Sequence, residues 1–147
     1  MGLFGDSSDE YFEGVYNAVK EWKPKQQYNS EAGYKEDLFQ YLSSKATKNL
    51  PQKETGRHLA DIGLSDKVGI EVKYGFHSKS EGDRLIGQLT SFLKDYKFGV
   101  IVVFCGSTDI NTLNYVKEQK TNLLKPYSNG GILAETFERH LAFIIKE

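Results

Sequence analysis

Three charged side chains interrupt a segment that otherwise has the pattern of two buried strands. They are Asp61, Glu71 and Lys73, within RHLADIGLSDKVGIEVKY at residues 57–74. Residues two apart in a strand share a face, so Glu71 and Lys73 point the same way and their apolar neighbours point the other way. Carboxylates are ligands that Mg²⁺ prefers, and a lysine beside them can orient or deprotonate a water or stabilise charge on phosphate. These residue types therefore indicate metal-assisted chemistry on a phosphate group.

The spacing predicts a hairpin with a three-residue turn at residues 65–67. That turn sets residue 64 opposite residue 68, and Asp61 opposite Glu71. The same register pairs apolar residues on the other face: Ile62 with Ile70, and Ala60 with Val72. Opposite residues have Cβ atoms about 4.5–5.5 Å apart, where like charges are destabilising unless something neutralises them. Two interpretations stay open: a divalent cation held by both carboxylates, or a solvated face with Lys73 as their ion-pair partner.

Patterns on either side of the hairpin predict the elements that must hold it. Apolar residues recur at helical spacing in residues 9–22, 30–48, 84–96 and 109–125, and Ser30 is a suitable cap for the second helix. FGVIVVFCG at residues 98–106 predicts a strand buried on both faces at the centre of the sheet, and HLAFIIKE at residues 140–147 predicts a last strand. A short helix that begins in AETFERH is an option before that strand. KNLPQKETG and GFHSKSEGD are expected to be loops, and the order of elements predicts an α/β domain with a mixed sheet.

Length and composition limit the classes of function. A chain of 147 residues is long enough for one domain with a real core. The formal net charge is -1, from 19 basic and 20 acidic residues, so contacts with nucleic acid must come from local patches. Cys105 is the only cysteine, which excludes an intrachain disulfide, and its place at the end of an apolar run favours packing over nucleophilic catalysis. Without an apolar run of about 18 residues, we expect a soluble, cytoplasmic protein with no membrane partner.

The charged residues of the hairpin also match a known pattern. Asp61, nine further residues and then Glu71-Val72-Lys73 resemble the D…(D/E)xK motif of the PD-(D/E)xK, or restriction-endonuclease-like, nuclease superfamily. The resemblance covers residues 33–105. The superfamily often has Pro immediately before the metal-binding Asp, whereas this chain has Ala60.

The resemblance implies a fold. It predicts an α/β domain with a restriction-endonuclease-like αβββαβ core, in which a mixed central sheet is flanked by helices. One strand of that core has no evident counterpart in the sequence. Residues 1–147 are then a single nuclease-like domain, with an N-terminal helical extension at residues 1–30 and a C-terminal helix and strand at residues 106–147.

Roles for individual residues follow from the same resemblance. Asp61 and Glu71 would bind the metal, Lys73 would serve the attacking water, and Glu36 matches the acidic residue that completes the metal shell from the first core helix. Gln88, in GQLTSF, resembles the QxxxY helix motif of RecB-like and resolvase-like members, with Phe in place of Tyr. Alternatives remain for both helical residues, because Glu36 suits the first turn of any helix and Gln88 suits any solvated helix face.

Basic residues near these motifs are candidates for nucleic-acid binding. Arg84 lies four residues before Gln88 on the same helical face, and Arg57 shares a strand face with Asp61, so both are candidate phosphate contacts. The segment KEWKPKQQY interleaves Lys23 and Lys25 with aromatic residues, a mixture that suits a phosphate backbone and stacked bases. The alternative is that its tryptophan closes the first helix against the core while the lysines stay in water.

Taken with the resemblance, these residues predict a Mg²⁺-dependent deoxyribonuclease, with Mn²⁺ as a substitute metal. It would hydrolyse phosphodiester bonds of nucleic acid, with DNA endonuclease activity expected, by attack of a Mg-activated water. Small members include junction resolvases, which act as dimers, so a homodimer is compatible with this prediction. The alternatives are a nuclease-fold module that binds or assembles on nucleic acid without turnover, and a protein-interaction domain whose acidic face only aids solubility.

Overall fold

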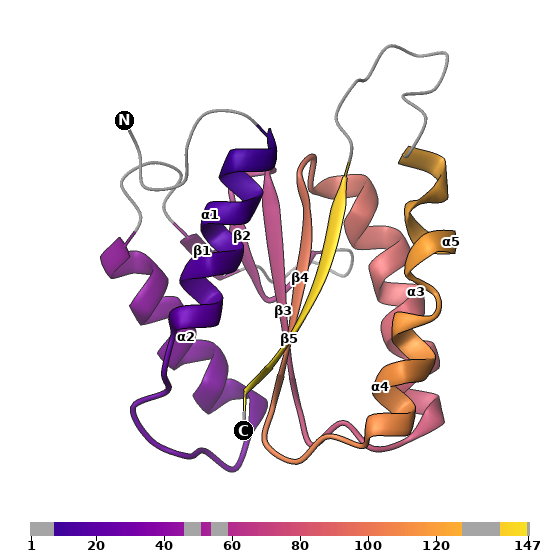
Figure 1. Ribbon diagram of the computed structural model, residues 1–147. Helices are drawn as coiled ribbons and strands as arrows, with labels where there is room; N and C mark the ends of the chain where they lie inside the picture. The colour runs from indigo at the N-terminus through magenta and orange to yellow at the C-terminus, as the bar shows by residue number, and fades with distance from the viewer. Residues whose placement is uncertain (1–7, 46–50, 54–58, 128–138, 147) are drawn as a thin grey trace.

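The computed structural model describes residues 8–45, 51–53, 59–127 and 139–146. These residues form a mixed α/β structure around an open five-stranded sheet in the order β1-β2-β3-β4-β5 (Figure 1). β1, β2 and β3 pair antiparallel, whereas β3, β4 and β5 pair parallel. The strands are β1 (Pro51–Lys53), β2 (Ile62–Leu64), β3 (Val68–Tyr74), β4 (Gly99–Cys105) and β5 (His140–Lys146).

Helices cover both faces of the sheet. Figure 1 shows α1 (Ser8–Glu21) and α2 (Glu31–Lys45) on one side, and α3 (Lys79–Asp95), α4 (Ile110–Lys117) and α5 (Lys120–Leu124) on the other. A short 3₁₀ helix, η1 (Lys125–Tyr127), follows α5. Each face has its own apolar cluster, one formed with α1 and α2 and the other with α3 and α4. Within the part of the chain that the structure describes, no helix is long and apolar enough to cross a membrane.

Most of the expected helices and the last strand are confirmed. Ser30 caps α2, because its hydroxyl oxygen accepts a hydrogen bond from the Gly33 N–H at 3.2 Å. The segment 109–125 is helical, but it forms two helices, α4 and α5. The short helix expected to begin in AETFERH falls largely on residues outside the described ranges.

Two expected loops are partly wrong. α3 begins at Lys79, inside the segment expected to be a connection, because Ser78 and Glu81 form a capping box that starts the helix early. Pro51–Lys53, expected to be a loop, pairs with β2 as a short strand. Proline is tolerated at the first residue of such an edge strand, where it removes no hydrogen bond that the ladder needs.

The buried strand is confirmed, with one change of position. All seven residues of β4 are buried, as expected for a strand covered on both faces. β4 lies between β3 and β5, so β3 is the middle strand. Gly99 starts β4 with φ of +137°, and a Cβ there would lie 2.0 Å from the carbonyl oxygen of His140. Glycine is therefore required where β4 meets β5.

The hairpin has the expected register. Ile62 pairs with Ile70 and Leu64 with Val68 around a turn at residues 65–67. Ser65 adopts a positive φ of 57°, as one residue of such a turn often does.

The expected pair between Ala60 and Val72 is wrong, and Asp61 and Glu71, also expected to lie opposite each other, are not paired in the ladder. The ladder ends at Ile62, and Ala60 packs in the cluster on the α3 face, whereas Val72 packs on the α2 face. The Ala60 N–H donates to the Tyr96 hydroxyl at 3.2 Å. The chain leaves the ladder here because a side chain, the Asp61 carboxylate, takes the Val72 N–H.

Candidate functional site

The candidate site lies where β3 extends beyond β2. The described pairing of these strands ends at Ile62 and Ile70, so the end of β3 from Glu71 to Tyr74 continues past the start of β2. On its other side β3 remains paired with β4 throughout. Asp61 immediately precedes β2 and therefore lies beside this end of β3.

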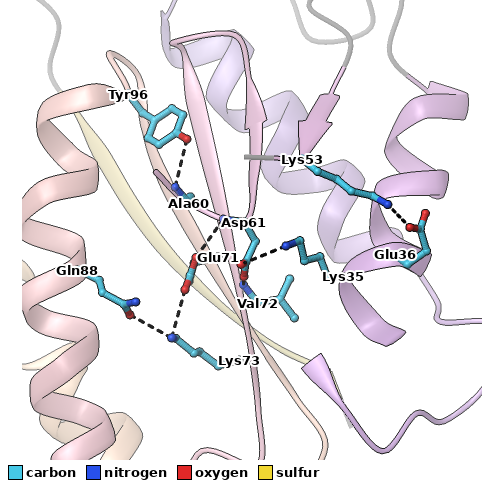
Figure 2. A network of polar contacts seen from close by, with 10 residues as sticks. All are labelled: Lys35, Glu36, Lys53, Ala60, Asp61, Glu71, Val72, Lys73, Gln88 and Tyr96. Atoms are coloured by element: carbon cyan, nitrogen blue, oxygen red, sulfur yellow. Dashed lines mark hydrogen bonds and ion pairs between the residues drawn. The ribbon is translucent and has the colours of Figure 1, made fainter. Parts of the chain in front are cut away.

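The carboxylates of Asp61 and Glu71 are held by backbone N–H groups, those of Val72 and Asp61 respectively (Figure 2). The Asp61 N–H donates to Glu71 Oε1 at 3.1 Å, and the Val72 N–H donates to Asp61 Oδ2 at 2.8 Å. Each carboxylate thus uses one oxygen to accept a backbone hydrogen bond from the opposite strand. The other oxygens, Asp61 Oδ1 and Glu71 Oε2, are left for other partners.

Those remaining oxygens face lysine side chains. Lys73 Nζ lies 3.2 Å from Glu71 Oε2 and donates to Gln88 Oε1 at 3.0 Å. Lys35 Nζ, from α2, lies 3.7 Å from Asp61 Oδ1. The structure therefore brings together four of the residues expected from the sequence, Asp61, Glu71, Lys73 and Gln88, and adds Lys35 to them.

Glu71 is a buried acid. The residue is only 5% exposed, so the interpretation of a fully solvated acidic face does not hold for it. Burial and, to a smaller extent, the nearby charge of Asp61 raise the pKa of Glu71 to about 7. The positive charge of Lys73 opposes this shift. A further positive charge near Oε2 would favour the ionised form, as expected of a carboxylate that binds a cation.

The carboxylate oxygens of Asp61 and Glu71 are of the ligand type that a hard divalent cation takes. Among the described residues, no group of three or more His, Cys, Asp or Glu side chains is placed to hold a metal ion. The pair would thus supply two carboxylates, and water and substrate would supply the remaining ligands. That division is typical of Mg²⁺, which binds through one or two carboxylates and retains several waters.

Glu36 is placed elsewhere. It forms an ion pair with Lys53 of β1 and accepts a hydrogen bond from Gln40 Nε2 at 2.9 Å. Figure 2 shows its carboxylate directed at Lys53, apart from the Asp61–Glu71 pair.

A different pair of α2 side chains reaches the end of β3 that extends past β2. Glu31 Oε1 accepts a hydrogen bond from the Tyr74 N–H at 3.4 Å, and Lys35 approaches Asp61. Sequence reasoning missed both residues. Their four-residue spacing puts them on one face of the helix, but nothing in the sequence shows that this face meets β3.

The expected nucleic-acid contacts are scattered. Arg84 is exposed on α3, four residues before Gln88, and Lys23 and Lys25 are exposed in the segment between α1 and α2. Arg57 lies outside the described residues. Trp22 is buried, at 1% exposure, which confirms the alternative that it closes the first helix against the core.

Trp22 instead contacts an acid that sequence reasoning did not single out. The Asp37 carboxylate accepts hydrogen bonds from Trp22 Nε1 at 3.0 Å, the Lys25 N–H at 2.8 Å and the Tyr28 hydroxyl at 2.7 Å. Burial alone would raise the pKa of Asp37, but the hydrogen bonds from Tyr28 and Trp22 outweigh it and keep the pKa below its ordinary value. Its role is to attach the segment between α1 and α2.

Comparisons of the chain with protein-family models, with curated proteins and with solved structures found no match. The site must therefore be interpreted from its own geometry. That geometry is two carboxylates, each fixed by a backbone hydrogen bond, a lysine held by one of them and by an amide, and α2 side chains along the end of β3.

Proposed function

We propose that the protein is a metal-dependent nuclease of the PD-(D/E)xK type that hydrolyses phosphodiester bonds, with DNA as the expected substrate. The proposal rests on two backbone hydrogen bonds that fix the carboxylates of Asp61 and Glu71. Lys73 Nζ lies beside them, 3.2 Å from Glu71 Oε2. Two fixed acids can hold a metal ion that activates water, and an ammonium group beside them can stabilise negative charge on the phosphate.

The order of the elements supports the proposal. From α2 to β4 the chain runs helix, three strands, helix, strand, which is the αβββαβ order implied by the resemblance. The strand without a counterpart in the sequence is β1, which pairs with β2 at the edge of the sheet. Glu71 and Lys73 lie on β3, Gln88 lies on α3, and Asp61 immediately precedes β2, an order that supports the proposal.

Each side chain has a role that follows from its contacts. Bound between Asp61 and Glu71, Mg²⁺ or Mn²⁺ would supply Lewis-acid chemistry and lower the pKa of water. Lys73, fixed between Glu71 and Gln88, places an ammonium group beside the acids, where it stabilises negative charge that develops on the phosphate. Gln88 acts through Lys73 and is a positioning residue.

One observation favours the alternative of a nucleic-acid-binding module without turnover. Lys35 and Lys73 already pair with the carboxylates of Asp61 and Glu71. A cation must compete with these ammonium groups. Metal binding without cleavage of any substrate would support this alternative.

Cleavage assays test the proposal. The purified protein is incubated with plasmid, single-stranded, flapped and four-way-junction DNA, with Mg²⁺, Mn²⁺ or EDTA. We expect cleavage that requires the metal, and a loss of about 100-fold or more in Glu71→Gln and in Lys73→Ala, as for removal of groups that act in the transition state. Gel filtration of the same samples tests the accompanying proposal of a homodimer.

Asp66→Asn is the matched control, because Asp66 lies in the turn of the same hairpin and pairs with Lys97 at the surface. Its activity should stay within about twofold of the wild type. Cleavage that persists unchanged in Glu71→Gln and Lys73→Ala would overturn the assignment of the site.

A further inference from the structure

A cavity of about 430 Å³ lies beside the ends of β3 and β4, on the face of the sheet that α2 covers. Tyr74 ends β3, Gly106 follows β4, and Tyr34 comes from α2. Small-molecule pockets usually measure about 300–1,000 Å³, so this volume suits one small, flat ligand. The proposed nuclease chemistry does not use this cavity, which we call the tyrosine pocket.

Three tyrosine rings form a rigid wall of the tyrosine pocket. The rings of Tyr28 and Tyr34 meet edge to face with centroids 5.1 Å apart, and those of Tyr34 and Tyr74 stack at 5.7 Å. The Tyr28 hydroxyl is bonded to Asp37, and the backbone of Gly106 packs so closely on Tyr74 that a Cβ would lie 2.8 Å from the ring. The wall is therefore formed before any ligand arrives, which reduces the entropy lost on binding.

The remaining side chains that line the tyrosine pocket are neutral and polar. Gln27 and Asn29 contribute amides, and Ser107 and Thr108 contribute hydroxyls. Among the described residues, none that lines it carries a charge. Aromatic faces with neutral donors and acceptors match a flat ring whose edges are polar.

The position of the tyrosine pocket relates it to the Asp61–Glu71 pair. Tyr74 follows Lys73 in β3 and lies three residues from Glu71, about 10 Å along the strand. Tyr74 and Glu71 lie on opposite faces of β3, but β3 has passed the end of β2 here. Glu31 and Lys35 of α2 lie along this edge of β3. A nucleic-acid strand with a phosphate at the acids would cross these two side chains to place a neighbouring base in the pocket.

We infer that the tyrosine pocket binds one unpaired nucleobase of the substrate, an inference that rests on the proposed nuclease function. A base inside a duplex is stacked and has its pairing edge occupied, so only an unpaired or extruded base can enter a pocket. The substrate class is then single-stranded nucleic acid, or a flap or branch with unpaired nucleotides next to the cleaved bond.

Binding in EDTA tests the inference independently of cleavage. The probes are a short labelled single-stranded DNA, the same strand with abasic sites, and its duplex, and the measurement is fluorescence anisotropy. We expect the wild type to prefer the strand that carries bases, and Tyr74→Ala to weaken that binding about tenfold, since a base stacked on an aromatic side chain contributes on that scale. Binding of the abasic strand and the duplex should change little.

Asn29→Ala is a second variant that tests the tyrosine pocket, because Asn29 is exposed and its loss leaves the core intact. It should weaken binding of the strand that carries bases, and circular dichroism checks the fold of each variant. Tyr115→Ala is the control, because Tyr115 lies on α4 and bonds Asp83 of α3, away from the tyrosine pocket.

Equal losses for the base-bearing and abasic strands, or none in either pocket variant, would overturn the inference. If the pocket variants behave as expected but no substrate is cleaved, the nuclease proposal fails while base binding stands.

Discussion

At the scale of single residues, the buried carboxyl of Glu71 makes the stability of the protein depend on pH. Folding raises its pKa from 4.5 to about 7, so between these values the folded state keeps a proton that the unfolded state releases. This contribution is fully present below the lower pKa and is lost as the pH rises through the upper one. Without divalent cations, we expect the free energy of unfolding to fall by at most about 3 kcal/mol more in the wild type than in Glu71→Gln between about pH 4.5 and pH 8.

Urea unfolding of both proteins at these two pH values measures the difference. Asp66→Asn should keep the pH dependence of the wild type, because Asp66 is exposed at the turn of the hairpin. Identical pH dependence in the wild type and Glu71→Gln would contradict a burial-driven shift of this carboxyl.

Lys35 and a cation would compete for the same oxygen of Asp61. Lys35 Nζ lies 3.7 Å from Asp61 Oδ1, one of the two oxygens that the backbone leaves available. Because the pair is partly exposed, its removal should have a modest effect, and we expect Lys35→Ala to bind Mn²⁺ about two- to fivefold more tightly. Titration calorimetry in the absence of DNA measures the affinity.

Lys53→Ala serves as the comparison, since Lys53 pairs with Glu36 and not with Asp61. It should leave the Mn²⁺ affinity close to that of the wild type. Weaker binding in Lys35→Ala would show that this lysine supports the cation site and does not compete with it.

At the scale of secondary-structure elements, Asp37 attaches the segment between α1 and α2. Its carboxylate, on a residue 6% exposed, accepts three hydrogen bonds from that segment. Asp37→Ala leaves the Trp22 indole N–H and a backbone N–H without this acceptor, so we expect the free energy of unfolding to fall by about 2–4 kcal/mol. Trp22 is the only tryptophan, so its fluorescence during urea unfolding reports on this contact directly.

The neighbouring substitution Glu36→Gln is the control, because the Glu36 ion pair is exposed and such pairs contribute about 0–1 kcal/mol. A loss in Asp37→Ala no larger than that in Glu36→Gln would show that the segment is held by apolar packing alone.

Elements whose form depends on nearby residues could be predicted from the sequence. The turn at residues 65–67 sets the pairing of Ile62 with Ile70 and with it the approach of Asp61 to Glu71. β1 could not be predicted, because three residues that begin with proline show no strand pattern and pair only where β2 provides a partner. The start of α3 had a local signal, the capping box at Ser78, but its polar residues also suit a loop.

At the scale of the whole molecule, the site depends on how α2 is rotated against the sheet. The buried residues Tyr34 and Leu38 set that rotation, and it turns Glu31 and Lys35 toward β3 while Glu36 meets β1. A sequence pattern identifies the apolar face of a helix but not which of the flanking polar residues reaches a given strand. For this reason Glu36 was a reasonable expectation that the contacts do not support.

The buried thiol of Cys105 can report how often the folded structure opens, and therefore whether a cation stabilises it. Cys105 ends β4 with no exposed surface, and burial raises its pKa to about 12. The reactive form of a thiol is the thiolate, so we expect modification by a disulfide reagent at about pH 8 only when the structure opens. A cation that binds the folded state should slow that reaction in the wild type but not in Asp61→Asn, because binding lowers the population of open forms. Rapid modification of the native protein would show that the thiol reacts without opening of the structure. Equal protection by Mg²⁺ in both proteins would show that the protecting cation does not bind at Asp61.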